Sequence, residues 1–172
     1  TLGNQDLIDR TGLPKATISR LTATLIKLGY LHYNEQLGRY SIGPATVCLG
    51  YTALSSSAVV HMAVPLMQEL ADRSGVAAAL GTRDGSEMVY LASCRSLAPV
   101  SLRLNVGSRL PIWNTAMGLA YLVEMKPEPR AALIGQMVEA HPDQAGRIRD
   151  LVAEAEDSYR KLGFVSVFGS WF

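Results

Sequence analysis

The side chains with the clearest chemical potential are small polar and basic residues on one face of a predicted helix near the N-terminus. From Pro14 to about Leu28, apolar residues recur at the spacing of one buried helical stripe, formed by Ile18, Leu21, Leu25 and Leu28. At about 100° per residue, the opposite face carries Ala16, Ser19, Arg20, Ala23 and Lys27, with Lys15 on its flank. Small residues let a backbone approach closely, while Ser, Lys and Arg reach the phosphates and base edges of DNA. The pattern indicates a DNA-reading helix; the solvated face of an ordinary helical hairpin is the alternative.

A short helix and a turn precede this segment and would position it. Asn4 to Arg10 is predicted to be helical, with Leu7 and Ile8 on its buried side. Gly12 can take the left-handed conformation that ends a helix, and Pro14 fits the first position of the next one, where a missing N–H matters least. Two helices joined by such a turn form a helix-turn-helix.

A β-hairpin is predicted directly after the second helix. Residues 30–33 and 39–42 form two short β-type runs around a turn at 34–38. A hairpin in this place makes the module a winged helix-turn-helix, and Arg39 beside the turn could contact a phosphate or the minor groove. The two elements together favour DNA binding over an ordinary helical hairpin.

Three motifs of this region resemble the DNA-binding domain of IclR-type bacterial transcriptional regulators. They are TGLPKATISRL at 11–21, LGYL at 28–31 and GRYSIG at 38–43, the last being the most particular to that family. The chain departs from the family pattern because the family has another helix before Asn4. The predicted DNA-contacting residues are Lys15, Ala16, Thr17, Ser19, Arg20, Lys27, Arg39 and Tyr40.

Charge is distributed in a way that confines polyanion binding to this first module. The 172 residues are 48% apolar, enough for a packed core, and carry 16 Lys and Arg against 15 Asp and Glu. Residues 1–43 hold five basic residues against three acidic ones, whereas the remainder holds 11 against 12. A DNA-binding surface would therefore have to be local.

Several other classes of protein are disfavoured by the sequence. Cys48 and Cys94 are too few and too isolated for a disulfide framework or a CxxC metal site. Neither a signal-peptide pattern nor an apolar run of about 18 residues is present, so we expect a cytoplasmic protein with no membrane contact. A cofactor is not expected either. Because the sequence starts at Thr1 and stops in apolar Trp171 and Phe172, it is interpreted as cut at both ends.

Beyond Pro44 the patterns predict a linker helix and then a larger domain. The expected division is a winged helix-turn-helix at 1–43, a linker helix at 44–57 and an effector-binding domain at 58–172. In the larger domain we expect strands at 76–80, 87–94 and 100–104, and another from Val165 onwards. Helices are expected at 59–74, 116–124, 130–138 and 144–162, the last packing on a sheet. The first of these helices would kink or restart at Pro65 and bury Met62, Leu66, Met67, Leu70 and Ala71. The mixture predicts an α+β fold.

A second resemblance lies in this larger domain. Residues 107–111 (GSRLP) and 115–120 (TAMGLA) are similar to the GAF-like α/β effector-binding domain of IclR-type regulators, which binds small carboxylates at the turn entering a helix. Free N–H groups and the positive dipole end of a helix favour such anions. Leu119 departs from the Lys or Arg of many relatives, and the family domain continues past Phe172. The resemblance implies an effector pocket lined by Leu110, Trp113, Asn114, Thr115, Ala116 and Met117, although the loop could simply pack the helix start.

The resemblance therefore implies a transcriptional regulator controlled by a small organic acid, with an aromatic acid favoured. Its expected partners are an operator in double-stranded DNA, the acid, and further copies of itself in a homodimer or homotetramer. No catalytic motif is found, and His32, His61 and His141 are scattered. An enzyme with a winged-helix interaction module, and a regulator whose large domain only oligomerises, are the alternatives.

Overall fold

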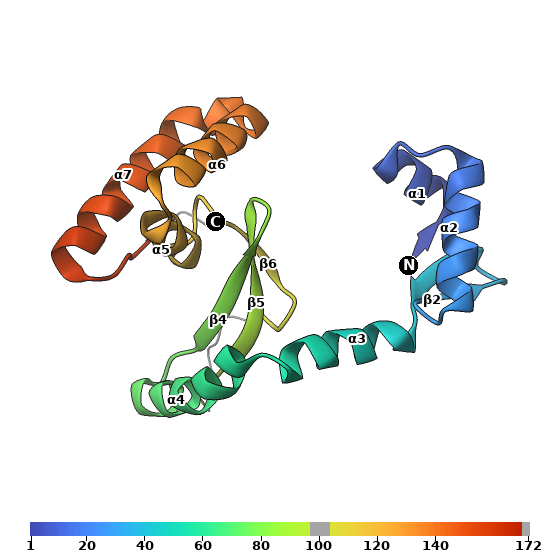
Figure 1. Cartoon of the computed structure of the whole chain (residues 1–172), viewed down its shortest axis with the longest axis horizontal. Coiled ribbons are helices and arrows are strands. Elements are labelled where there is room, and N and C mark those ends of the chain that lie inside the picture. Colours follow the sequence, from blue (N-terminus) through green and yellow to red (C-terminus); the bar gives the residue numbers. More distant parts are fainter. Residues whose placement is uncertain (97–103, 170–172) are drawn as a thin grey trace. The chain divides into compact units, whose positions relative to one another are not determined.

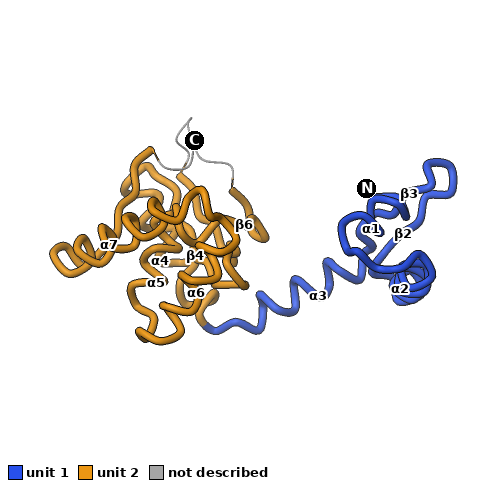
Figure 2. Tube along the Cα trace, turned by 90° about the horizontal axis from the view of Figure 1, so that it is seen from above, with its two compact units in different colours: residues 1–58 blue, residues 59–172 orange. Residues whose placement is uncertain are grey.

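The computed structural model describes residues 1–96 and 104–169. The chain forms two compact units, Thr1–Ala58 and Val59–Phe172, coloured separately in Figure 2. The helix predicted as a linker belongs to the first unit.

The first unit is a winged helix-turn-helix followed by a further helix (Figure 1). Its elements in order are β1 (Leu2–Gly3), α1 (Asn4–Thr11), α2 (Lys15–Lys27), β2 (Leu31–Asn34), β3 (Arg39–Ile42) and α3 (Pro44–Ser55). The three strands form an antiparallel sheet in the order β1-β3-β2, in which β2 and β3 are the wing. The predicted helix-turn-helix and hairpin are confirmed.

The turn between α1 and α2 has the predicted conformation. Gly12 has φ +65°, and its N–H donates to the Ile8 carbonyl oxygen at 2.8 Å, which closes α1. Pro14 precedes the first helical residue of α2, one position earlier than predicted. Its carbonyl oxygen accepts from the Thr17 N–H at 2.9 Å, so the proline starts the helix without losing a hydrogen bond.

The predicted buried stripe of α2 is largely wrong. Ile18 is only 4% exposed, but Leu21, Leu25 and Leu28 are 48%, 38% and 58% exposed. The second buried residue of the helix is Thr22, whose hydroxyl satisfies itself by donating to the Ile18 carbonyl oxygen. Periodicity finds the apolar face of a helix, but the neighbours α1 and β2 cover only the Ile18 and Thr22 side.

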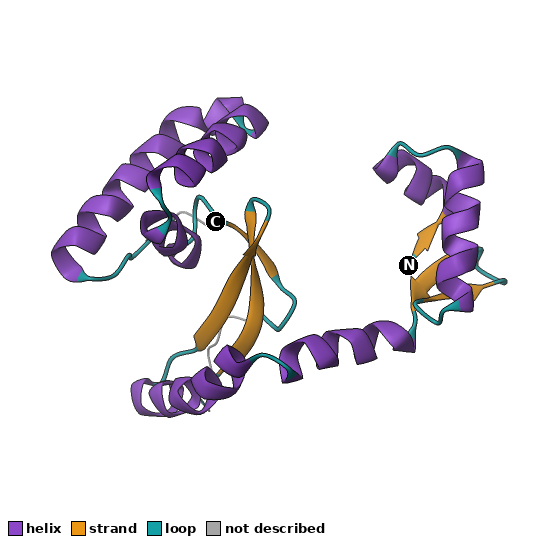
Figure 3. Ribbon diagram, in the orientation of Figure 1, coloured by secondary structure: helices purple, strands orange, loops and turns teal. Residues whose placement is uncertain are grey.

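The second unit is α+β (Figure 3). Its elements are α4 (Ala58–Ser74), β4 (Ala78–Asp84), β5 (Glu87–Cys94), β6 (Arg109–Pro111), α5 (Ala116–Glu124), α6 (Pro127–Ala140), a short 3-10 helix (Pro142–Gln144) and α7 (Ala145–Leu162). The antiparallel sheet has the order β4-β5-β6. β4 and β5 form an antiparallel hairpin that turns after Asp84, which pairs with Glu87.

The third strand of the sheet differs from the predicted one. Arg109–Pro111, expected to be loop, is a strand that pairs with residues 87–89. It was missed because a run of only three residues is too short to show the alternation of a strand. Of the strand predicted at 100–104, residues 100–103 lie outside the described residues and Leu104 is not in a strand. Residues 165–169 form no strand, and 170–172 are not described.

The core of the second unit lies between the sheet and α5, α6 and α7. Met88 of β5 and Ile112 pack with residues from all three helices, namely Leu119, Leu122, Leu133, Met137, Ile148, Val152 and Ala155. The last helix α7 packs against α5 and α6, which corrects the prediction that it lies on the sheet. The apolar face of α7 is buried, but against α5 and α6.

The first helix of this unit also buries less than predicted. It runs through Pro65 without a break, and Met62, Leu66 and Leu70 are 66%, 69% and 58% exposed. Only Ala71 is fully buried, while the Cys94 thiol donates to the Val64 carbonyl oxygen at 3.7 Å and holds β5 beside α4. No single helix in the described part of the chain is both long and apolar enough to cross a bilayer.

Candidate DNA-binding and effector-binding surfaces

The outer face of α2 combines small side chains with cations. Lys15, Ala16, Ser19, Arg20 and Lys27 are all exposed. Thr17, also predicted to touch DNA, is half-buried beside the turn. None of the three cations forms an ion pair with a described residue. Their donors are therefore available to phosphate oxygens or base edges.

The two predicted wing residues have partners within the unit. The Tyr40 ring lies against Tyr33, with 4.9 Å between ring centroids, and its hydroxyl donates to Asn4 Oδ1 at 3.3 Å. Arg39 Nη1 lies 3.5 Å from Asp6 Oδ2 and donates to the Thr1 carbonyl oxygen at 3.1 Å. These contacts attach the wing to the start of α1, a link that sequence reasoning missed because Asp6 and Arg39 are distant in the chain.

The start of α5 is a capped helix N-terminus. Thr115 caps the helix: its hydroxyl accepts from the Gly118 N–H at 3.3 Å and donates to the Pro111 carbonyl oxygen at 2.8 Å. Ala116 and Met117 are the first two helical residues, whose N–H groups point along the helix axis out of its N-terminus. This helix end favours negative charge.

The other predicted effector residues surround this helix start unevenly. Leu110 is 4% exposed and pairs with Met88 across the sheet, so it belongs to the core. The partly buried Trp113 and Asn114 lie between β6 and α5, and the Trp113 ring is 6.2 Å from the ring of His141. Met117 lies against β4, where a Cβ on Gly81 would stand 2.4 Å from its sulfur. The structure thus brings Trp113, Asn114, Thr115, Ala116 and Met117 to one helix start but leaves Leu110 beneath them.

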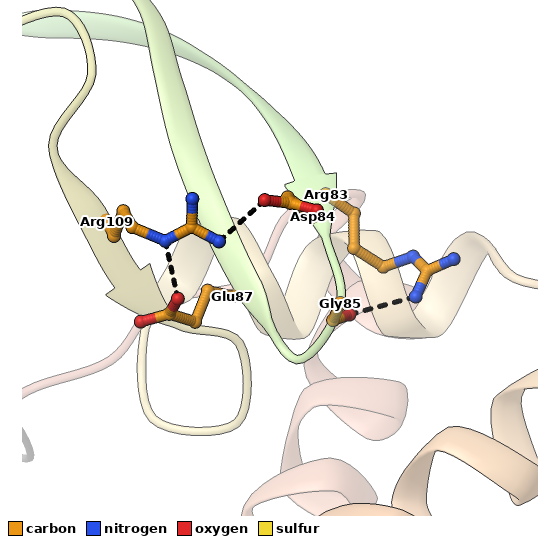
Figure 4. Close-up of polar contacts among 5 residues, drawn as sticks. All are labelled: Arg83, Asp84, Gly85, Glu87 and Arg109. Carbon is orange, nitrogen blue, oxygen red and sulfur yellow. Dashed lines mark hydrogen bonds and ion pairs between the residues drawn. The ribbon is translucent and has the colours of Figure 1, made fainter. Parts of the chain in front are cut away.

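A cluster of charged residues holds β6 on the β4–β5 hairpin (Figure 4). Arg109 donates to Glu87 Oε2 through Nε and to Asp84 Oδ2 through Nη2, both at 2.6 Å. The hydrogen bonds to Glu87 and then Asp84 raise the pKa of the Arg109 guanidinium. Arg83 instead donates to the Gly85 carbonyl oxygen at 2.9 Å. Its guanidinium carbon lies 6.0 Å from the Tyr121 ring centroid. Arg109 thus links β6 to the hairpin, while Arg83 contacts both the hairpin turn and α5.

A separate cavity of about 220 Å³ lies between α5, α7 and the segment after α7. Leu119, Leu151, Ala155 and Val167 give it apolar walls, and Glu154 is its charged member. No sequence pattern indicated it, because its walls come from three segments whose pairing is tertiary.

Comparison with known proteins decides the family. Residues 51–145 match the family described as bacterial transcriptional regulator IclR C-terminal, and residues 1–35 match the IclR helix-turn-helix domain. The chain belongs to the IclR family.

Individual IclR-family proteins show the same relationship over nearly the whole chain. The HTH-type transcriptional regulator TsaQ1/TsaQ2 of Comamonas testosteroni is 36% identical over 166 residues, which are 95% of this chain and 60% of that protein. The Pca regulon regulatory protein of Pseudomonas putida is 35% identical over 117 residues, 67% of this chain and 40% of that protein.

A solved IclR-family structure supports the fold. The transcriptional regulator from Brucella abortus is 36% identical and superposes with a TM-score of 0.88, covering 99% of this chain and 64% of that one. The chain thus spans about three fifths of the length of the first of these relatives. The relatives are transcriptional regulators, and the predicted family and α+β architecture are confirmed.

Proposed function

We propose that this chain binds an operator through α2 and the wing, and that a small organic acid bound at the start of α5 controls this binding. The observation that carries the DNA-binding part is the exposed cationic face of α2, the second helix of a helix-turn-helix. Its cations form no ion pair with any residue that the structure describes. The proposed contacts are those of Lys15, Ala16, Thr17, Ser19, Arg20 and Lys27 from the helix, and of Arg39 and Tyr40 from the wing.

The proposed effector is a carboxylate with an aromatic face. The N–H groups of Ala116 and Met117 would receive the carboxylate, and the Thr115 hydroxyl holds this helix start in place. Asn114 adds a polar amide, and Trp113 offers a large apolar surface beside it, suited to an aromatic ring. Leu110 would support this surface from the core.

A winged helix covers only one half-site, so we propose that the protein works as a homodimer or homotetramer on a palindromic operator. The acid would then act by changing how two DNA-binding modules are spaced.

Selection of bound duplexes from a random pool tests the DNA-binding part. We expect enrichment of sequences with two-fold related half-sites; a pool that stays random after several rounds would contradict sequence-specific binding. Affinity for the enriched duplex is then measured with benzoate, with acetate and without acid. We expect benzoate to change the affinity more than acetate, and equal affinity under all three conditions would refute control by an aromatic acid.

A further inference from the structure

The wing arginine has a carboxylate partner placed on the helix next to it. β1 and β3 pair so that Gly3 lies opposite Arg39, which brings the Arg39 side chain to the start of α1. Asp6 lies in the first turn of that helix, and its Oδ2 atom is 3.5 Å from Arg39 Nη1. The side chains are 48% and 43% exposed, so the ion pair is open to solvent.

Asp6 has a second partner that does not depend on Arg39. The same Oδ2 atom accepts a hydrogen bond from the Gly3 N–H at 2.8 Å and so caps α1. If Arg39 leaves, the carboxylate keeps this backbone donor and does not become an unpaired charge. Separation of the ion pair therefore leaves α1 intact.

The ion pair is weak enough to be exchanged for a DNA contact. Half-exposed pairs at such separations contribute little to the stability of a protein. A DNA phosphate is an equally good acceptor for a guanidinium, and a duplex offers one negative charge per roughly 1.7 Å of its axis. Replacing the Asp6 carboxylate by a DNA phosphate as the partner of Arg39 therefore costs little free energy.

We propose that Asp6 competes with the DNA backbone for Arg39, so that a phosphate replaces the carboxylate when the wing engages DNA. Asp6 thereby weakens DNA binding, and when no DNA is bound it holds the Arg39 side chain in a fixed place. This inference rests on the proposed function, because it requires the first unit to bind DNA.

The chain offers a matched control for the loss of one negative charge. Asp9 lies one turn further along α1, is exposed, and accepts from Gln5 Nε2 at 2.8 Å; its partner is not Arg39. Asp6→Asn keeps an oxygen for the Gly3 N–H but removes the charge, and Asp9→Asn removes the same charge beside the site.

Fluorescence anisotropy with a labelled duplex of arbitrary sequence tests the proposal, because phosphate contacts are independent of sequence. We expect Asp6→Asn to bind about two- to fivefold more tightly than the wild type, the equivalent of the pair's strength. Asp9→Asn should gain clearly less, and in an Arg39→Gln background the two changes should have equal effects. Equal gains for Asp6→Asn and Asp9→Asn in the wild-type background would overturn the proposal.

The salt dependence of binding gives a second test that does not require Asp6 to be changed. Between about 50 and 200 mM salt, loss of one phosphate contact lowers the slope of log K against log salt by about 0.9. We expect this decrease for Arg39→Gln; an unchanged slope would mean that Arg39 meets no phosphate and that Asp6 competes with nothing. Absence of salt-dependent binding by the wild type would instead refute the proposed DNA-binding function.

Discussion

Gly118 lies directly against the main chain of Ile112. A Cβ at residue 118 would stand 2.1 Å from the Ile112 carbonyl oxygen and 2.5 Å from its Cα. Gly118 also donates its N–H to the capping hydroxyl of Thr115. The close approach seats the start of α5 on the residues that follow β6, and so fixes the place where the effector is proposed to bind.

Gly118→Ala should therefore destabilise the second unit. Because the obstacle is backbone and not a flexible side chain, we expect the free energy of unfolding to fall by about 1–3 kcal/mol or more. Gly135→Ala is the matched control, since nothing lies within 4 Å of its added Cβ in the middle of α6. For Gly135→Ala we expect the free energy of unfolding to rise by about 0.5–1 kcal/mol. Urea unfolding of both variants measures the two changes. Similar changes in the free energy of unfolding would refute the close packing of α5 on Ile112.

Trp113 should determine the strength of aromatic acid binding. Trp113→Ala removes the proposed ring contact, and we expect benzoate affinity to fall roughly two- to tenfold, the range of one aromatic pair. Trp113→Phe keeps an aromatic face and should retain most of the affinity. Titration calorimetry measures both. If the alanine variant binds benzoate as the wild type does, the acid lies elsewhere.

Tyr90 should make stability depend on pH in the alkaline range. Burial raises the pKa of its phenol above the usual value of 10.0. The neutral form is favoured by folding, so this contribution is complete below the unfolded pKa and is lost as the pH rises through the folded pKa. Urea unfolding at about pH 9 and about pH 11 should show a smaller decrease in stability for Tyr90→Phe than for the wild type. An equal decrease would assign the loss to other groups.

Local patterns in the sequence were sufficient for most of the first unit. Gly12, Pro14 and the β-type runs around residues 34–38 each act over a few residues, and the turn, α2 and wing follow from them. The amphipathic face of α7 was also predictable, because Ile148, Val152 and Ala155 repeat at helical spacing.

Features that depend on which segments become neighbours were not predictable. The exposure of Leu21 and Leu66 reflects the absence of a covering element among the described residues, which periodicity does not report. The Asp6–Arg39 pair requires β1 to lie beside β3, and the Met117–Gly81 contact requires the start of α5 to lie against β4. In the proposed effector site, the resemblance identified the helix start, but the core position of Leu110 became clear only from its pairing with Met88.

Binding of the enriched duplex by Arg20→Ala is the most direct test of the central claim that α2 reads DNA. Arg147→Ala is the control, because Arg147 is an exposed arginine on α7 and the change in net charge is the same. We predict that Arg20→Ala loses about 1–3 kcal/mol of binding free energy while Arg147→Ala binds as the wild type does. Equal affinity of the two variants for this duplex, with both folded, would contradict the account.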